Sequence, residues 1–231
     1  MAHIDDAVAR ILNQRAILPE DRSLLVGISG IDGSGKGFVA AQIEAHLAQH
    51  AIAAARINVD DWLKLPDERF SPIDPGKHFY EHAIRFDEFF TQLVLPLRDH
   101  RSLSLSADFA EETARKYRKH TYSFKNVGVI LVEGIFLFKR EQRKLFDLAI
   151  WTDCSFPTAL ARALKRGQEG LPPAATIWAY ETVYFPAQRI HQDRDNPQDS
   201  ADLVLDNDPY LNRPLWYLAN PGTSVRARSA H

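Results

Sequence analysis

Cysteine is almost missing from this chain of 231 residues, since Cys154 is the only one. A single thiol cannot form an intramolecular disulfide, which excludes the disulfide frameworks of small secreted proteins and indicates an intracellular protein. The first residues, Met1 to Asp6, include acidic side chains with no apolar run behind them, so we expect no secretory signal. No segment reaches the ~18 consecutive apolar residues of a membrane span. We therefore expect a soluble, cytoplasmic protein without a membrane partner.

An excess of charge of one sign is also missing. The chain has 28 Lys and Arg against 30 Asp and Glu, which gives a formal net charge of −2. A protein that coats nucleic acid needs a dense cationic face, so we expect no nucleic-acid partner. Hydrophobic residues make up 45% and charged residues 25%, which are ordinary globular values that exclude disordered and fibrous classes.

Strands and helices are predicted to alternate along the chain. Apolar periodicity predicts helices over 4–18, around 39–47, and over 78–98, 156–166 and 174–191, with a break in the third near 85–87. Short apolar runs predict strands over 24–28, 52–59, 127–132, 147–152 and 202–205. We expect a loop over 63–77 and a small β excursion over 102–124. This alternation predicts an α/β fold with a mainly parallel sheet flanked by helices.

The length of the chain is enough for one good core, so we expect one elaborated domain rather than two. An N-terminal helix is expected within 1–22, the main domain over 23–210, and a C-terminal tail over 211–231. The small, polar residues from Pro221 onward predict fraying of that tail. The sequence leaves homo-oligomerisation open.

A glycine-rich segment between a predicted strand and a predicted helix carries the strongest motif. Residues 30–36 read G-x-x-x-x-G-K, the pattern of a phosphate-binding loop. Glycines let successive backbone N–H groups converge on phosphate oxygens, the helix N-terminus adds a positive dipole, and Lys36 adds a point charge. The alternative, a chance glycine-rich turn, does not explain the context on both sides. We expect the following residues to contact the nucleotide: Gly30, Asp32, Gly33, Ser34, Gly35, Lys36, Gly37 and Phe38.

One position departs from this motif. The residue after Lys36 should be Ser or Thr, whose hydroxyl binds Mg²⁺, but it is Gly37, and Phe38 also lacks a hydroxyl. Either the metal is held through water and other carboxylates, or turnover of ATP is weak. A nucleotide-binding regulatory protein that has lost turnover therefore remains an alternative function.

Two acidic residues are expected where predicted strands end. Asp60 closes the second strand, and Glu133 follows the apolar run 127–132. Phosphoryl transfer needs a metal-binding acid and a group that orients or deprotonates the acceptor hydroxyl, and ligands of open α/β sheets bind at this carboxyl edge. Burying an ionised carboxylate at the end of a buried strand costs free energy, and a purely structural role would not offset that cost. This favours a function for Glu133. Asp61 is an alternative to Asp60 as the reactive carboxylate.

These motifs and others resemble the uridine kinase-like branch of P-loop kinases, which also holds phosphoribulokinase and relatives of bacterial pantothenate kinase. The matching segments are Gly-Ile-Asp-Gly-Ser-Gly-Lys at 30–36, Val-Asp-Asp-Trp at 59–62, Val-Glu-Gly-Ile-Phe-Leu-Phe at 132–138, Phe-Asp-Leu-Ala-Ile-Trp-Thr-Asp at 146–153, Ala-Arg-Ala-Leu-Lys-Arg at 161–166 and Ala-Asp-Leu-Val-Leu-Asp-Asn at 201–207. The resemblance spans about 20–210. It implies a P-loop NTPase fold with a lid and a kinase that uses ATP and Mg²⁺. A uridine-like nucleoside is the first candidate acceptor, and a sugar or a pantothenate-like alcohol comes next.

The resemblance also implies roles for individual residues. Asp60 looks like the aspartate that accepts the proton of the acceptor hydroxyl, and Glu133 looks like the acid near Mg²⁺, with Asp60 as a second candidate ligand. Arg162 and Arg166 look like lid arginines that close over the γ-phosphate. These two lie one helical turn apart and can share a face, although a solvated basic face is the alternative.

The lid and the acceptor pocket are less sharply defined. Gly167 and Gly170 flank an expected lid hinge. Asp108-Phe109 resembles a pair that binds sugar hydroxyls in uridine kinases. The side chains expected to face the acceptor are Asp60, Arg85, Asp108, Tyr117, Gln188 and Arg189.

A pattern of another enzyme class occurs at residues 78–82, which read H-x-x-E-H. Two imidazoles four positions apart can share a helix face and bind Zn²⁺. No third ligand is evident in the sequence. A zinc hydrolase is therefore the weakest of the three functional hypotheses.

Overall fold

The structure is a computed structural model that describes residues 3–167 and 170–209. A five-stranded sheet with the order β2-β5-β1-β6-β7 forms its centre, and every pairing in it is parallel. Its strands are β1 (Leu24–Ser29), β2 (Ala54–Asn58), β5 (Val129–Gly134), β6 (Leu148–Asp153) and β7 (Leu203–Asp206). The mainly parallel sheet expected from the alternation of strands and helices is confirmed. The expected tail over 211–231 lies outside the described residues.

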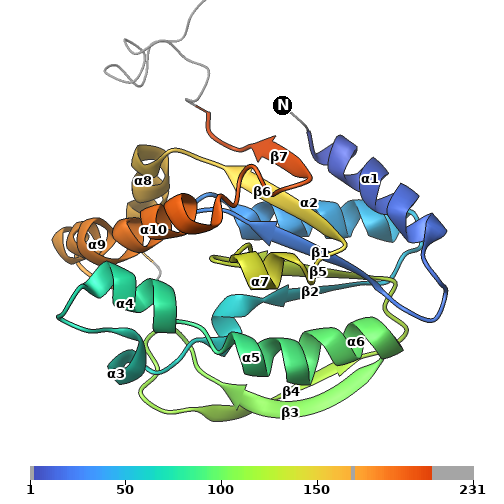
Figure 1. Ribbon diagram of the computed structural model, residues 1–231, viewed down its shortest axis with the longest axis horizontal. Helices are drawn as coiled ribbons and strands as arrows, with labels where there is room; N and C mark the ends of the chain where they lie inside the picture. Colours follow the sequence, from blue (N-terminus) through green and yellow to red (C-terminus); the bar gives the residue numbers. More distant parts are fainter. Residues whose placement is uncertain (1–2, 168–169, 210–231) are drawn as a thin grey trace, which may run out of the picture.

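Two hydrophobic cores lie on opposite faces of this sheet. Successive residues of β1 and β5 alternate between the cores, as side chains of a strand do: Leu25 and Ile130 belong to one, and Val26 and Leu131 to the other. Both strands are buried throughout, which explains their continuous apolar sequence. Figure 1 shows α1 (Ile4–Ile17) and α2 (Lys36–Gln49) on one side of the sheet. On the other side lie α5 (Phe86–Glu88), α6 (Leu95–His100) and the hairpin of β3 (Leu103–Phe109) and β4 (Arg118–Phe124).

The first core is closed by α1 (Ile4–Ile17) and α2 (Lys36–Gln49). Buried side chains of α1, among them Val8 and Ile11, pack on those of α2 and the sheet. The boundary expected near residue 22 stays a prediction. In the part of the chain that the structure describes, no helix has the length and apolar character needed to cross a membrane.

Most helical segments outside α1 and α2 supply side chains that close the second core. They are η1 (Val59–Trp62), α4 (Pro75–His82), α5 (Phe86–Glu88), a π-helical turn over Phe89–Val94, α6 (Leu95–His100), α8 (Phe156–Arg166), a π-helical turn over Tyr180–Tyr184, and α10 (Phe185–Asp195). The helices α3 (Pro66–Arg69), α7 (Arg140–Arg143) and α9 (Pro173–Ala179) contribute no residue to it. The break predicted near 85–87 is confirmed, because α4 ends at His82 and α5 begins at Phe86.

Two further expectations for this half of the chain have different outcomes. The β excursion is confirmed as an antiparallel hairpin of β3 (Leu103–Phe109) and β4 (Arg118–Phe124). The expectation of a loop over 63–77 is wrong, since α3 and the start of α4 lie there. Pro66 and Pro75 each occupy the first turn of a helix, where backbone N–H groups have no intrahelical acceptor. The missing N–H of proline therefore costs no hydrogen bond there, and these prolines begin helices.

Parallel pairing brings the carboxyl ends of the strands to one edge of the sheet. Asn58, the last residue of β2, lies opposite Glu133 near the end of β5, and Glu133 lies opposite Ile28 of β1. The loop after β1 leads directly into α2. Helices α8, α9 and α10 lie beside this same edge (Figure 1). The segments singled out in the sequence therefore converge here.

Candidate active site

The glycine-rich loop connects β1 to α2 and has a conformation that needs its glycines. Gly33 and Gly35 have φ angles of 77° and 91°, in the left-handed region. A Cβ at Gly33 would lie 2.6 Å from the carbonyl oxygen of Ala159, and one at Gly35 would collide with the side-chain amide of Asn207. Gly35 is also the N-cap of α2 and offers no side chain to cap it. The N–H groups of the first turn therefore remain available to an anion.

Positive charge is placed on this loop by Lys36. Its side chain is buried, and its ammonium donates a hydrogen bond of 2.9 Å to the carbonyl oxygen of Ile31. Asp32 accepts hydrogen bonds from the backbone N–H of Gly33 at 2.8 Å and from the hydroxyl of Tyr180. The loop is thus tied to the helical segment that precedes α10.

The two predicted carboxylates lie at the ends of their strands, as expected. Asp60 is in η1, directly after β2, where its backbone N–H donates 2.9 Å to the side-chain oxygen of Asn58. Burial raises the pKa of Asp60 to about 7, against the opposing effect of Lys36. Burial also raises the pKa of Glu133, which is 8% exposed. A base with a pKa near neutrality suits proton transfer from a hydroxyl group.

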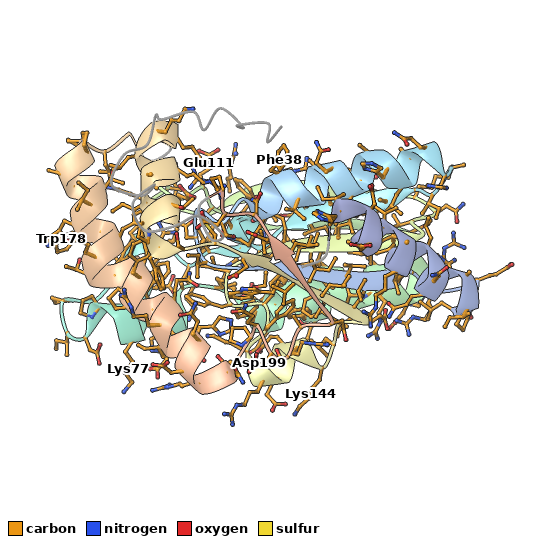
Figure 2. All side chains as sticks on the ribbon, turned by 90° about the horizontal axis from the view of Figure 1, so that it is seen from above. Phe38, Lys77, Glu111, Lys144, Trp178 and Asp199 are labelled. Carbon is orange, nitrogen blue, oxygen red and sulfur yellow. The ribbon has the colours of Figure 1, made fainter. Side chains whose placement is uncertain are left out.

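Six of the eight predicted nucleotide residues and both carboxylates share one cavity of about 340 Å³. It is lined by Asp32, Gly33, Gly35, Lys36, Gly37, Phe38, Asn58, Asp60, Glu112, Glu133, Arg162, Ala163 and Arg166. Figure 2 shows Phe38 at the N-terminal end of α2, where its side chain is 62% exposed. Gly30 and Ser34 are buried within the loop and do not line this cavity.

The cavity fits the groups that the resemblance implies. Backbone donors at the start of α2 and the Lys36 ammonium suit phosphate oxygens. Magnesium prefers oxygen ligands, which Glu133 and Asp60 supply in the same cavity. A Cβ on Gly37 would lie only 3.3 Å from Oε1 of Glu133, so this carboxylate reaches the place next to Lys36 where the motif has a hydroxyl.

The two predicted lid arginines have different surroundings. Arg162 donates hydrogen bonds to the carbonyl oxygens of Ser34 at 3.0 Å and Asn207 at 2.7 Å, and the Asn207 amide donates to the same Ser34 oxygen at 2.7 Å. Arg162 therefore holds the phosphate loop against the segment after β7. Arg166 lies one turn further along α8, half exposed, with its guanidinium 3.8 Å from Asp32.

The hinge glycines Gly167 and Gly170 have left-handed φ angles of 56° and 64°, and residues 168–169 lie outside the described part of the chain. Glycine adopts this conformation without strain. Their role as a hinge stays a prediction.

Of the residues expected at the acceptor, the structure brings Gln188 and Asp60 together. Both line a second cavity, of about 60 Å³, on the far side of Lys36. Arg85 is buried and donates to Glu88 at 2.8 Å and to the backbone carbonyl of Asp108. Arg85 and Asp108 do not line a cavity that contains Asp60.

The remaining two candidates also point elsewhere. The hydroxyl of Tyr117 donates to Glu68 at 3.3 Å, and its ring lies under the Arg85 guanidinium. Arg189 is exposed on α10 and lies over the ring of Phe156. Neither residue lines one of the three cavities that contain Asp60, so their roles at the acceptor stay predictions.

Several cavity residues were missed by sequence reasoning. Arg69 and Glu112 line the second cavity with Phe79 and Tyr184, and they come from α3, the β3–β4 connection, α4 and the π-helical turn before α10. No motif marks them, because they are far apart in the sequence. The Pro-rich composition of 63–77 concealed the helix that carries Arg69.

The H-x-x-E-H pattern has other contacts. His78 and His82 do lie close, with ring centroids 4.5 Å apart, but Nε2 of His78 is 3.0 Å from the carbonyl oxygen of Glu68, and Glu81 forms an ion pair with Arg194 at 3.2 Å. Among residues 3–167 and 170–209, no three His, Cys, Asp or Glu side chains are grouped as a metal site requires. The zinc hypothesis thus gains no third ligand in that part of the chain.

Comparison with known proteins shows which proteins this chain is similar to. No family model matches the chain. A uridine kinase from Macrococcus caseolyticus is 29% identical over 190 residues, which are 80% of this chain and 88% of that protein. Among solved structures, a possible uridine kinase from Bacillus stearothermophilus has a TM-score of 0.67 at 21% identity, covering 88% of this chain and 99% of its own.

A candidate fructose transport system kinase from Silicibacter sp. TM1040 has a TM-score of 0.69 at 17% identity and covers 89% of this chain and 100% of its own. The two structural similarities confirm the predicted P-loop NTPase α/β fold. Together with the sequence similarity, they confirm the resemblance to uridine kinase-like P-loop kinases.

Proposed function

We propose that this chain, which is similar in sequence to uridine kinases and has the fold of P-loop kinases, transfers the γ-phosphate of ATP to a hydroxyl group of a small acceptor. The observation that carries the proposal is the shared cavity, in which Asp60 faces both the phosphate loop and the acceptor-side cavities. A uridine-like nucleoside or a sugar is the candidate acceptor.

The phosphate loop binds the nucleotide in this proposal. Backbone N–H groups at the start of α2 and the Lys36 ammonium hold the phosphates. Glu133, with Asp60 as a second ligand, holds Mg²⁺, which neutralises charge on the phosphate oxygens when bound. Arg166 lines the same cavity and can turn from Asp32 to the transferring group.

Asp60 orients the acceptor hydroxyl and takes up its proton. Because its pKa is about 7, about half of the Asp60 carboxylate is ionised at neutral pH, and the ionised form is basic enough to accept a proton. Most of the rate enhancement comes from positioning and from charge stabilisation, since phosphoryl transfer needs little covalent chemistry from the protein. We also propose that the protein is located in the cytoplasm.

Single-turnover ATP consumption in the presence of nucleosides and sugars tests this function. We expect one acceptor to stimulate ATP consumption strongly. If ATP binds with micromolar affinity and no acceptor stimulates its consumption, the kinase proposal is wrong, and the alternative raised by Gly37, a nucleotide-binding protein without turnover, replaces it.

A further inference from the structure

Gln188 carries a buried amide group without a partner among residues 3–167 and 170–209. The residue belongs to α10 and is 1% exposed, and neither Oε1 nor Nε2 of its side chain has a hydrogen-bond partner in that part of the chain. Leaving a buried polar group unsatisfied costs roughly 1–3 kcal/mol. The amide lines the cavity of about 60 Å³ that also contains Asp60 and Lys36. A ligand in this cavity would satisfy it.

The chemistry of this amide indicates what the ligand presents. A carboxamide places a donor and an acceptor side by side, so its best partner also offers a donor and an acceptor at neighbouring positions. Adjacent hydroxyl groups do so, because each hydroxyl can donate and accept. The aromatic rings of Phe79 and Tyr184 line the same cavity and can cover the C–H face of a compact polyol.

Carboxylates dominate the acceptor side of Asp60. A third cavity, of about 260 Å³, is lined by Asn58, Asp60, Asp61, Phe109, Ala110, Glu111, Glu112 and Thr113, with no basic side chain among them. Ionised carboxylates accept hydrogen bonds and cannot donate them, and they repel anions. They therefore favour a ligand that is rich in donors and carries no negative charge.

The cations on this side are already engaged. The ammonium of Lys36 bonds to the carbonyl oxygen of Ile31, and the Arg69 guanidinium donates to the carbonyl oxygens of Lys64 and Glu112. In the second and third cavities an acidic acceptor would meet five carboxylates, those of Asp32, Asp60, Asp61, Glu111 and Glu112, against the two lining cations Lys36 and Arg69. Arg162 and Arg166 line the neighbouring nucleotide cavity. The charge distribution disfavours hydroxy acids and phosphorylated sugars.

A uridine-like nucleoside matches this lining less well than a polyol. The carbonyl oxygens of a uracil ring need donors, which the ionised carboxylates of the third cavity cannot supply. Among the described side chains that line this cavity, only those of Asn58 and Thr113 can donate. In the pair that resembles a sugar-binding motif, Asp108 forms an ion pair of 2.8 Å with Lys119, while Phe109 lines the third cavity and offers no hydrogen-bonding group.

We propose that the phosphate acceptor is an uncharged polyol, a sugar or a cyclitol, whose adjacent hydroxyl groups pair with the Gln188 amide. This inference rests on the proposed kinase function and names its substrate class. In the reaction, the acceptor oxygen forms a bond to the γ-phosphorus while its proton passes to the Asp60 carboxylate. The bond from the γ-phosphorus to the β,γ-bridging oxygen breaks, and ADP leaves.

An acceptor panel tests the class. The purified full chain is assayed with Mg²⁺ and ATP against neutral hexoses and pentoses, cyclitols, uridine, cytidine and D-glycerate. We expect a sugar or cyclitol to give a kcat/KM at least 100-fold above those of uridine, cytidine and D-glycerate. Equal or better use of a nucleoside or of D-glycerate overturns this inference while the kinase function stands. If no acceptor stimulates ATP consumption, the kinase function itself fails and the inference fails with it.

Substitution of Gln188 tests the residue. Gln188→Leu should raise the KM for the preferred polyol at least tenfold and leave the Kd for ATP unchanged. Gln188→Glu keeps the shape of the side chain and an acceptor oxygen, so it should raise the KM less than Gln188→Leu does. It replaces the leucine variant in this test if that variant does not fold. The matched control is Gln198→Leu, the same change at an exposed residue, which should behave like the unmodified protein. An unchanged KM in both Gln188 variants overturns the assignment.

Discussion

Gly37 lies directly against Glu133: a Cβ on residue 37 would be 3.3 Å from the carboxylate oxygen Oε1. In the phosphate-loop motif this position carries the hydroxyl that binds Mg²⁺. The glycine leaves room for the carboxylate to approach the loop. The acid at the end of β5 and the residue after Lys36 therefore share one place in the site, and their substitutions should be coupled.

The first prediction concerns Gly37→Ser. The added Cβ requires Glu133 to move by only a few tenths of an ångström, and the hydroxyl adds an oxygen ligand for the metal. We expect the concentration of Mg²⁺ needed for half-maximal activity to fall severalfold. Gly37→Ala is the matched control, because it adds the same Cβ without the hydroxyl, and it should not lower the Mg²⁺ requirement. Equal effects of both variants would show that bulk, and not metal binding, matters at this position.

The second prediction concerns Lys36→Ala. Removing a buried ammonium from the phosphate loop should weaken ATP binding at least tenfold, measured by isothermal titration calorimetry. Lys165→Ala removes an exposed lysine of α8 and should leave the affinity unchanged. Unchanged affinity in Lys36→Ala would contradict the assignment of this loop to phosphate binding.

The third prediction concerns catalysis by Asp60. Asp60→Asn should lower kcat by a factor of roughly 10²–10⁴, the usual contribution of a general base, with ATP affinity nearly intact. In the unmodified protein kcat/KM should fall about tenfold per pH unit below the pKa of about 7, because protonated Asp60 cannot accept a proton. Equal losses of turnover and ATP binding in the variant would mean that Asp60 is structural.

The same substitution should change stability in a pH-dependent way. Burial raises the pKa of Asp60 above its unfolded value of 3.8, so the ionised form is disfavoured in the folded protein. Above pH 7 the buried, ionised carboxylate lowers the free energy of unfolding. As the pH falls from 7 towards 4, Asp60 becomes protonated in the folded protein and this destabilisation disappears. At pH 8 Asp60→Asn should therefore be more stable than the unmodified protein, by on the order of 1–3 kcal/mol. Urea unfolding at pH 8 and pH 5 checks the sign, since the difference should shrink at the lower pH.

The fourth prediction separates Arg162 from Arg166. Arg162→Ala removes the bonds to the carbonyl oxygens of Ser34 and Asn207, so it should weaken ATP binding and lower the free energy of unfolding by about 1–3 kcal/mol. Arg166→Ala loses one long ion pair with Asp32 and should lower kcat with little change in stability. Thermal unfolding and single-turnover kinetics distinguish the two. Identical profiles would place both arginines in one role.

Much of the fold and the nucleotide side of the site could be predicted from the sequence. Buried parallel strands need long apolar runs, and those runs locate β1, β5 and β6 directly. The glycines of the phosphate loop, Lys36, Asp60 and Glu133 follow the strands, and parallel pairing brings strand ends to a common edge. Their convergence therefore follows from chain order and sheet direction alone.

The acceptor side was decided by tertiary structure. Gln188 was one of several polar candidates around the cleft, and nothing in its neighbourhood distinguished it from Arg189, which lies over the ring of Phe156 instead. Arg85 and Tyr117 were plausible by position, yet they pack on one another away from the cleft. Arg69 and Glu112 line the same cavity as Gln188, and they belong to segments in which the sequence shows no motif.

The reason for this division is physical. A phosphate is recognised by backbone geometry and helix dipole, which a short contiguous segment fixes by itself: residues 30–37 determine their own conformation through Gly33 and Gly35. The side chains that line the proposed acceptor cavities come from separate elements, and their directions depend on how α3, α4 and α10 pack against one another. The sequence by itself therefore predicted a phosphate-binding loop at the end of β1, while only the packing of those helices decided which side chains line the proposed acceptor site.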